Sequence, residues 1–226
     1  MLCTAAGCCA LAGPAQAQTG GVPVPKPVAP TTGGTGYGTP GTRAIRVAPT
    51  ALRNETVYVR GTLPGAAHRR VILQRLDPER GWRNERRGRV RSTERLRIRW
   101  RARRSGRISL RVVLGPRRRS MSRAGTAPVA KINVYRRMMA TYFGPGLYGR
   151  TTACGQVLTP LLHGVAHKTL PCGTPVALMF EGREVIVPVV DRGPFHGDFA
   201  LDLTQATADA LAFASSAAIG YIRLPS

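Results

Sequence analysis

The feature that most limits the fold of this chain is a strict alternation of arginine with apolar residues. In the stretch RLRIRWRAR, which begins at Arg95, the residues Leu96, Ile98, Trp100 and Ala102 occupy every second position and arginine occupies the others. Successive side chains of a β-strand point to opposite faces, so period two indicates a strand with one buried and one solvated face. The stretch is therefore predicted to be a half-buried strand.

The same apolar period continues after Ser105 and Gly106, which predicts a hairpin of two half-buried strands. Further strands are expected in TVYVRGTL, RRVILQRL and APVAKINVY, with turns at Pro64-Gly65 and Asp77-Pro78 between them. About seven short strands at this spacing are typical of a β-sandwich. The pattern resembles the small immunoglobulin-like modules of bacterial surface enzymes, and we expect such a sandwich at residues 43–135.

The charge of the chain is concentrated in this predicted sandwich. Residues 43–135 contain 25 arginines and one lysine against five acids, a net charge of +21, whereas residues 138–226 have a net charge of −1. Arginines side by side on one sheet face repel each other, and an anionic partner would remove that cost. We expect anionic wall polymers as partners, and a merely solvated face is the alternative. Nucleic acid is not expected, because base-stacking aromatics are scarce.

The first 42 residues are predicted to lie outside any folded domain. Residues 1–17 are small and apolar and end in an A-x-A pattern, which indicates the remnant of a secretion signal. Residues 18–42 are rich in Pro, Gly and Thr and are predicted to be a linker. No later run has the length of a membrane helix. The protein is therefore expected to be secreted or associated with the cell wall, and attachment as a lipoprotein through Cys8 is the less favoured alternative.

Removal of residues 1–17 leaves two cysteines, Cys154 and Cys172. In an oxidising compartment such a pair predicts a disulfide. His163 and His167 are four residues apart, but HGVAH lacks the glutamate and the helix of a zinc-protease motif. No metal site and no cofactor are therefore expected.

The C-terminal part has a different pattern, with short strands, glycines and few charges. PVALMF and REVIVPVV are predicted strands joined by a turn at Glu181-Gly182, and Pro188 requires that the second strand be at an edge or bulged. Asp191 falls where this strand ends. LTQATADALAF is predicted to be a short helix with Thr204 as its N-cap, and GYIRLP a last strand. These elements suit a small closed barrel.

Four motifs of this part appear in the order found in a known family. ATYFGPGLYGRTTACGQ, GVAHKTLPCGTPV, VVDRGPF and FALDLT resemble the rare lipoprotein A family over residues 140–224. The resemblance implies a six-stranded double-psi β-barrel at residues 138–226, related to expansins and family 45 glucanases. It also implies that the protein acts on peptidoglycan glycan strands as a lytic transglycosylase.

The resemblance also implies which residues carry the chemistry. The family's active-site histidine and aspartate correspond to His167 and Asp191, and Gln156 stands where the family has a glutamate. Because an amide cannot donate a labile proton, Gln156 puts the enzymatic interpretation in doubt. The likeness of FALDLT to expansins points to Asp202 as a second carboxylate.

Lytic cleavage uses the 6-hydroxyl of muramic acid as the nucleophile, so a single acid can protonate the leaving oxygen and then act as base. Asp191 is the candidate for both roles. It would need a pKa raised by burial, and the neighbouring Arg192 would lower that pKa. The further candidate residues for substrate binding are Gln156, Tyr142, Phe143, Tyr148, Thr151, Thr152 and Arg192.

Each of these assignments has a structural alternative. His167 would then order its loop, Asp191 and Asp202 would be hydrogen-bond acceptors at a turn and near the helix start, and the two threonines would be ordinary strand residues. The corresponding alternatives for the whole protein are a non-catalytic, expansin-like binder of the wall and a basic anion-binding surface protein with an inert barrel.

Overall fold

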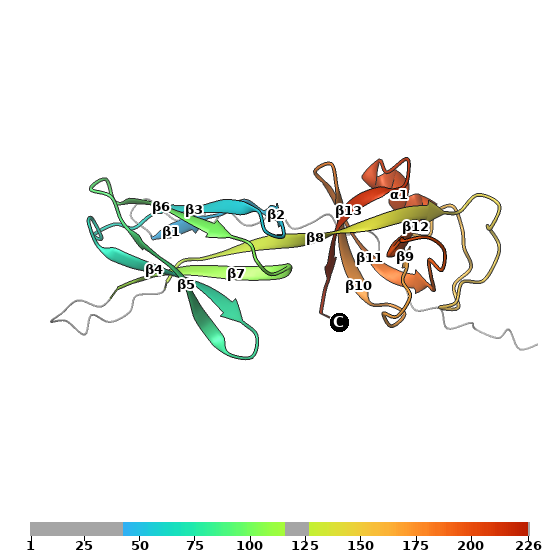
Figure 1. Cartoon of the computed structure of the whole chain (residues 1–226), viewed down its shortest axis with the longest axis horizontal. Coiled ribbons are helices and arrows are strands. Elements are labelled where there is room, and N and C mark those ends of the chain that lie inside the picture. The colour runs from blue at the N-terminus through green and yellow to red at the C-terminus, as the bar shows by residue number, and fades with distance from the viewer. Residues whose placement is uncertain (1–42, 116–126, 226) are drawn as a thin grey trace, which may run out of the picture.

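The computed structural model describes residues 43–115 and 127–225, which form two β-rich halves joined by one long strand (Figure 1). The predicted signal remnant and linker lie outside the described residues. In chain order the elements are β1 (Ala44–Arg46), β2 (Thr50–Leu52), β3 (Thr56–Thr62), β4 (Arg70–Asp77), β5 (Gly81–Arg89), β6 (Arg95–Arg101), β7 (Gly106–Leu114), β8 (Val129–Phe143), β9 (Val165–Ala166), β10 (Pro175–Phe180), β11 (Arg183–Asp191), β12 (Leu201–Thr204), α1 (Gln205–Leu211) and β13 (Ala217–Arg223).

The N-terminal half, which we call the arginine-rich domain, consists of β1–β7 and the first part of β8 in two layers. One layer is a three-stranded sheet in the order β1-β3-β6, and the other runs from β8 through β7 and β4 to β5, with β2 paired in parallel to β8. Side chains from both layers form one core, to which β3 contributes Val57 and Val59 and β7 contributes Leu110 and Val112. The finer, immunoglobulin-like assignment stays a prediction.

The alternation in β6 has the predicted orientation. Leu96, Ile98 and Trp100 are each 3% exposed, whereas the arginines between them are exposed. The predicted hairpin of β6 with β7 is wrong, however, because β6 pairs with β3 while β7 pairs with β4 and β8 in the other layer. Period two determines which face of a strand is buried but does not identify its neighbour. Here the two apolar faces cover each other across the core.

β8 belongs to both halves of the molecule. Its residues 129–134 pair with β7, residues 133–135 with β2, residues 136–140 with β13 and residues 140–143 with β12. Every residue of this 15-residue strand therefore has a partner in a neighbouring strand. The domain boundary expected between residues 135 and 138 falls inside β8.

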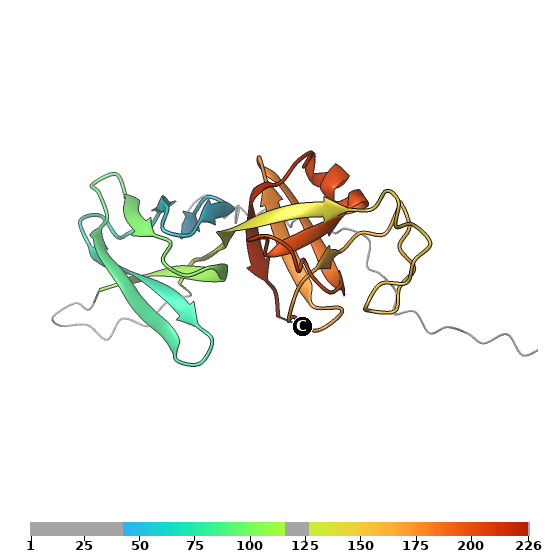
Figure 2. The same cartoon turned by 45° about the vertical axis from the view of Figure 1, so that its right-hand side comes forward.

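The C-terminal half, which we call the barrel domain, is a closed ring of six strands in the order β8-β12-β9-β11-β10-β13, with β13 returning to β8 (Figure 2). The turn at Glu181-Gly182 is present, and both residues have the positive φ of a tight hairpin, 47° and 81°. α1 follows Thr204 as predicted, although Thr204 makes no side-chain cap and binds the carbonyl of Gly164 instead. Among the described residues, no helix has the length and apolarity needed to cross a membrane.

A small apolar cluster joins the two halves. Tyr135 of β8 packs with Ile222 and Leu224 of the barrel domain, and Leu52 of β2 packs against the same cluster. Burial raises the pKa of Tyr135, and Glu184 of β11, which hydrogen-bonds it, adds to this increase. The junction is thus a packed and hydrogen-bonded interface.

Candidate functional site

Two carboxylates lie in one lateral row across four neighbouring strands of the barrel. In this row Thr141 of β8 is opposite Asp202 of β12, Asp202 is opposite Ala166 of β9, and Ala166 is opposite Asp191 of β11. Residues that pair across strands project from the same face of a sheet. Because Leu201 and its equivalents on neighbouring strands face the barrel core, the row projects from the opposite face of the sheet, where Asp191 and Asp202 are partly exposed and Ala166 is buried.

Ala166 separates the two carboxylates with only a methyl group. Two strand spacings place the Cα atoms of Asp191 and Asp202 about 10 Å apart. The groups are close enough to interact, because the charge of Asp191 contributes to raising the pKa of Asp202. The row thus holds two acids on either side of a small residue.

A β-bulge brings Asp191 into this row. Val189 pairs with Val165, and Asp191 pairs with the next residue, Ala166, so Val190 is the extra residue of β11. Val190 is fully buried and packs with a small apolar cluster under the loop before β9. A Cβ at Gly164 would overlap the side chain of Val190, which explains the glycine at this position. Bulges commonly redirect a side chain next to an active site.

The carboxylate of Asp191 is held by backbone amides. Its Oδ1 accepts hydrogen bonds from the N–H groups of Ala153 and Arg192, both at 2.8 Å. Within residues 43–115 and 127–225 no hydrogen bond reaches Oδ2. One oxygen is therefore fixed and the other is available to a ligand.

The disulfide predicted between Cys154 and Cys172 is present. Cys154 follows Ala153, whose N–H binds Asp191, so the bridge anchors the segment that orients this carboxylate. The guanidinium of Arg192 donates to Cys172 Sγ at 3.3 Å and to the backbone carbonyls of His167 and Asp191 at 3.5 Å. Arg192 therefore braces the loops rather than pairing with the carboxylate beside it.

Asp202 occupies the middle of β12 and is the more strongly perturbed acid. Burial raises its pKa to about 6; the nearby charge of His196 opposes this increase and that of Asp191 adds to it. Its Oδ1 is buried and has no hydrogen-bond partner among the described residues. A carboxyl group of this kind holds its proton in mildly acidic solution and can donate it to a bound ligand.

His167 lies just beyond β9, one residue after Ala166, and orders its own loop. Its Nδ1 accepts the backbone N–H groups of Thr169 and Leu170, each at 3.1 Å. Its ring stacks on that of Tyr221 with centroids 6.4 Å apart. Burial lowers the pKa of His167, and the charges of Arg136 and Arg192 lower it further. His167 therefore contacts its own loop and Tyr221, and among the residues that the structure describes no hydrogen bond or ring contact joins its side chain to Asp191 or Asp202.

Gln156, Thr151 and Thr152 lie in the loop of residues 144–164, which projects from the end of the barrel far from the arginine-rich domain (Figure 2). The backbone N–H of Thr152 donates to the carbonyl of Gln156 at 2.7 Å, and the N–H of Gln156 donates to Thr152 Oγ1 at 3.2 Å. Thr151 forms an isolated bridge with Val157. The Oε1 atom of Gln156 is buried and has no partner among the described residues.

The predicted aromatic residues are not gathered around the carboxylates. Tyr142 packs edge-to-face on Phe213, with centroids 6.4 Å apart, and pairs with the core residue Leu203. Phe143 packs on the apolar cluster around Val190, and Tyr148 lies on the exposed loop. The structure thus brings Asp191 and Asp202 together but places Tyr142 on the opposite face of its strand.

Three residues of the site were not expected from the sequence. Thr141 and Ala166 complete the row, and His196 influences the pKa of Asp202. Thr141 and Ala166 could not be identified as site residues from the sequence, because threonine and alanine are common in short strands. His196 lies between the two acids in the sequence, and only that position could have drawn attention to it.

The barrel domain is similar in sequence to proteins that are named as peptidoglycan transglycosylases. Residues 137–223 match the family model described as lytic transglycolase. A probable endolytic peptidoglycan transglycosylase RlpA of Synechocystis is 40% identical over 80 residues, which are 34% of this chain and 25% of that protein. The RlpA of Pseudomonas aeruginosa strain UCBPP-PA14, named an endolytic peptidoglycan transglycosylase, is 36% identical over 92 residues, which are 39% of this chain and 27% of that protein.

A solved structure, the Streptomyces papain inhibitor (SPI), is 26% identical and covers 38% of this chain and 94% of its own, with a TM-score of 0.30. The chain spans about a quarter of the length of the two RlpA relatives above, and the family match coincides with the barrel. Residues 137–223, which make up most of the barrel domain, are therefore similar to the RlpA-like double-psi β-barrel family.

Proposed function

We propose that this protein cleaves the glycan strands of peptidoglycan as a lytic transglycosylase. The observation that carries the proposal is the row in which Asp202, whose pKa is raised to about 6, and Asp191, with one free oxygen, lie on either side of Ala166. The names of the relatives support the same reaction. Two acids on an outer barrel face can act on an extended polymer without requiring a deep cavity.

The two acids divide the work in this proposal. Asp202 donates its proton to the glycosidic oxygen as the bond from that oxygen to the anomeric carbon breaks. The 6-hydroxyl of the muramic acid attacks the same carbon and loses its proton to Asp191, which forms the 1,6-anhydro ring. The proton balance is restored through water before the next cycle. The sequence led to Asp191 as both acid and base, because lytic cleavage can use a single acid, whereas the raised pKa of Asp202 favours Asp202 as the donor.

His167 and Arg192 are positioning residues in this scheme. Both hold the loops around Asp191 through hydrogen bonds that involve backbone groups, and Arg192 also contacts the disulfide. Neither is required to exchange a proton with the substrate. Gln156 does not replace the family glutamate as an acid, because an amide has no labile proton.

Digestion of purified peptidoglycan tests the reaction, with 1,6-anhydro ends counted by mass spectrometry. We expect Asp191→Asn and Asp202→Asn each to lower the rate by about 100-fold or more, the usual range for loss of acid-base catalysis. Activity of the unmodified protein should fall as the pH rises through about 6, because Asp202 then loses its proton. Asp209→Asn, on the exposed surface of α1, is the matched control and should retain the rate.

A non-catalytic, expansin-like glycan binder is the second candidate, and Gln156 favours it. An amide has no labile proton to give to a glycosidic oxygen, so a glutamine at the position of the family's glutamate suits binding better than cleavage. Sedimentation with insoluble peptidoglycan, without release of any anhydro product at any pH, would establish this alternative and exclude the transglycosylase.

The same proposal places the protein outside the cytoplasm, where peptidoglycan lies. The arginine-rich domain would then keep it close to anionic polymers of the wall, because its charge of +21 over residues 43–135 is opposite in sign to theirs. This retention should weaken as the salt concentration rises.

A further inference from the structure

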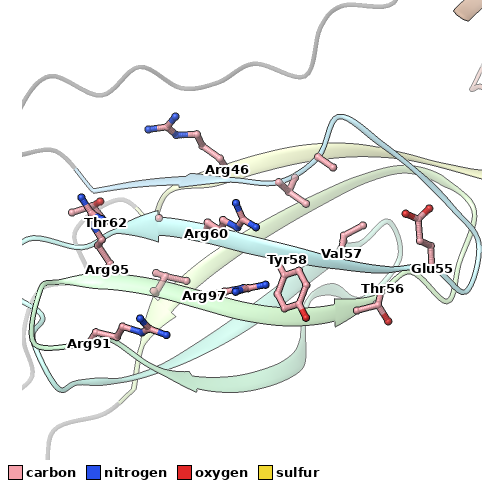
Figure 3. Close-up of a pocket in the computed structure, with 14 residues that line it drawn as sticks. Arg46, Glu55, Thr56, Val57, Tyr58, Arg60, Thr62, Arg91, Arg95 and Arg97 are labelled. Carbon is pink, nitrogen blue, oxygen red and sulfur yellow. The ribbon is translucent and has the colours of Figure 1, made fainter. Parts of the chain in front are cut away.

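We infer that the outer face of the sheet β1-β3-β6 is a binding groove for a linear phosphodiester polymer. The groove has a volume of about 800 Å³ and is lined by arginines from β1, β3, β6 and the turn before β6 (Figure 3). These arginines are Arg46, Arg60, Arg91, Arg95 and Arg97. The inference goes beyond the proposed cleavage, and it rests on the proposed function only for the choice of a wall polymer over a nucleic acid.

Three of these arginines form a row across the sheet. Arg46 pairs with Arg60, and Arg60 pairs with Arg97, so their side chains leave the same face at intervals of about 5 Å. Like charges directly opposite each other on neighbouring strands destabilise a sheet. The row therefore carries a cost in the free protein that a multiply charged anion would relieve.

No carboxylate neutralises the groove. In the part of the chain that the structure describes, the salt bridges involve Arg75 and Arg104, neither of which lines it. Glu55 is the one acid in the lining, and its Oε2 accepts the backbone N–H of Leu52 at 2.8 Å. Figure 3 shows Glu55 at the end of the groove opposite Arg91 and Arg95. The guanidinium groups are thus free to bind a ligand.

Tyr58 holds one of these groups in place. The guanidinium of Arg97 lies over the Tyr58 ring, 3.9 Å from its centroid, as Figure 3 shows. A stacked guanidinium keeps the N–H groups in its plane available for a bidentate contact. The stacking also occupies the one aromatic ring of the groove, so no platform remains for a nucleic-acid base.

The arrangement favours a ligand whose charges repeat at short intervals. A single anion would satisfy two or three of the five guanidinium groups, whereas a chain of phosphodiesters can satisfy all of them in turn. Each phosphodiester presents two charged oxygens that match the guanidinium fork. We therefore assign the groove to a wall polymer with a polyol phosphate backbone.

Binding of fluorescein-labelled poly(glycerol phosphate) to the full chain, followed by fluorescence anisotropy, tests the assignment. The double variant Arg60→Gln/Arg97→Gln should weaken binding at least about tenfold, because two charge-assisted contacts are lost. The slope of log affinity against log salt concentration should become shallower by about 1.4, which corresponds to two fewer phosphate contacts. Both substitutions are on exposed side chains, and retention of the fold is checked by thermal unfolding.

Arg83→Gln/Arg86→Gln is the matched control, since it removes the same charge from exposed positions of β5 outside the groove. Its effect on log Kd should be less than half of the effect of Arg60→Gln/Arg97→Gln. Equal losses in both double variants would mean diffuse attraction and would overturn the site. Equally tight binding of a single-stranded DNA of matched charge would overturn the choice of polymer.

The outcomes for the groove and for the barrel can be told apart. Asp191→Asn should bind the labelled polymer as the unmodified protein does, and Arg60→Gln/Arg97→Gln should still form 1,6-anhydro ends from purified peptidoglycan free of other wall polymers. If the binding test fails but cleavage is intact, only the assignment of the groove as a polymer-binding site is wrong. If cleavage fails but binding is intact, only the proposed transglycosylase activity is wrong.

Discussion

The ionised carboxyl group of Asp202 destabilises the folded protein. Its carboxyl is largely buried in a sheet, and its pKa lies at about 6 in place of 3.8. Below pH 3.8 the group is protonated in both the folded and the unfolded chain and costs nothing. Between the two values only the unfolded chain ionises, so folding becomes less favourable as the pH rises. Above about pH 6 the penalty is complete and constant.

We expect Asp202→Asn, which should slow cleavage, to stabilise the protein at pH 7. The gain in the free energy of unfolding should be on the order of 1 to 2 kcal/mol, after allowance for solvent screening of a partly exposed group. It should shrink to nothing near pH 3.8, and urea unfolding at a series of pH values measures it. A constant gain at every pH would show that ionisation of Asp202 is not its cause.

At the scale of elements, the site depends on two loops that a disulfide connects. The disulfide connects the 144–164 loop to the loop after β9, and the N–H of Ala153, next to Cys154, orients Asp191. His167 Nδ1 organises the start of the second loop. The position of the Asp191 carboxylate is thus set by two loops and not by β11 alone.

The double variant Cys154→Ser/Cys172→Ser should therefore lose turnover as well as stability. We expect a loss on the order of 3 kcal/mol in the free energy of unfolding, from the restored freedom of the unfolded loop. The rate of anhydro product formation should fall by at least about tenfold at a temperature where the variant is still folded. Binding of poly(glycerol phosphate) should not change. A full rate in the folded variant would show that the bridge does not position Asp191.

The same scale shows what the sequence could predict. The alternation around Ile98 identified buried and exposed faces correctly, and Glu181-Gly182 identified a hairpin, because both signals are local. The partner of β6 was predicted wrongly, since period two is shared by every half-buried strand. The row of Asp191 and Asp202 could not be derived, because it depends on a bulge and on a two-residue strand between them.

At the scale of the whole molecule, the continuous strand β8 and the cluster around Tyr135 connect the two halves, and we expect them to unfold as one cooperative unit. Tyr135 is 1% exposed, and it contacts barrel residues while pairing with Leu52 of β2. Loss of such a side chain leaves a cavity that both halves share. Stability should therefore not partition between the halves.

We expect Tyr135→Ala to lower the free energy of unfolding by about 3 to 5 kcal/mol, the range for loss of a large buried aromatic side chain. Hydrogen exchange should accelerate together in β3 of one half and β10 of the other. Tyr58→Ala, which removes a tyrosine that is 39% exposed, is the control and should leave exchange in β10 unchanged. Faster exchange in only one half would contradict a single cooperative unit.

The unbroken pairing of β8 would limit which glycan bonds an attached molecule can reach. A strand of 15 residues extends over roughly 50 Å and leaves no unpaired residue at which to swivel. A molecule bound to a wall polymer through its arginine-rich domain would hold Asp191 and Asp202 at a constant distance from the point of attachment. The protein would then reach only glycan bonds that lie at this distance from each attachment point. A protein with a flexible linker between its domains would reach all bonds within its range.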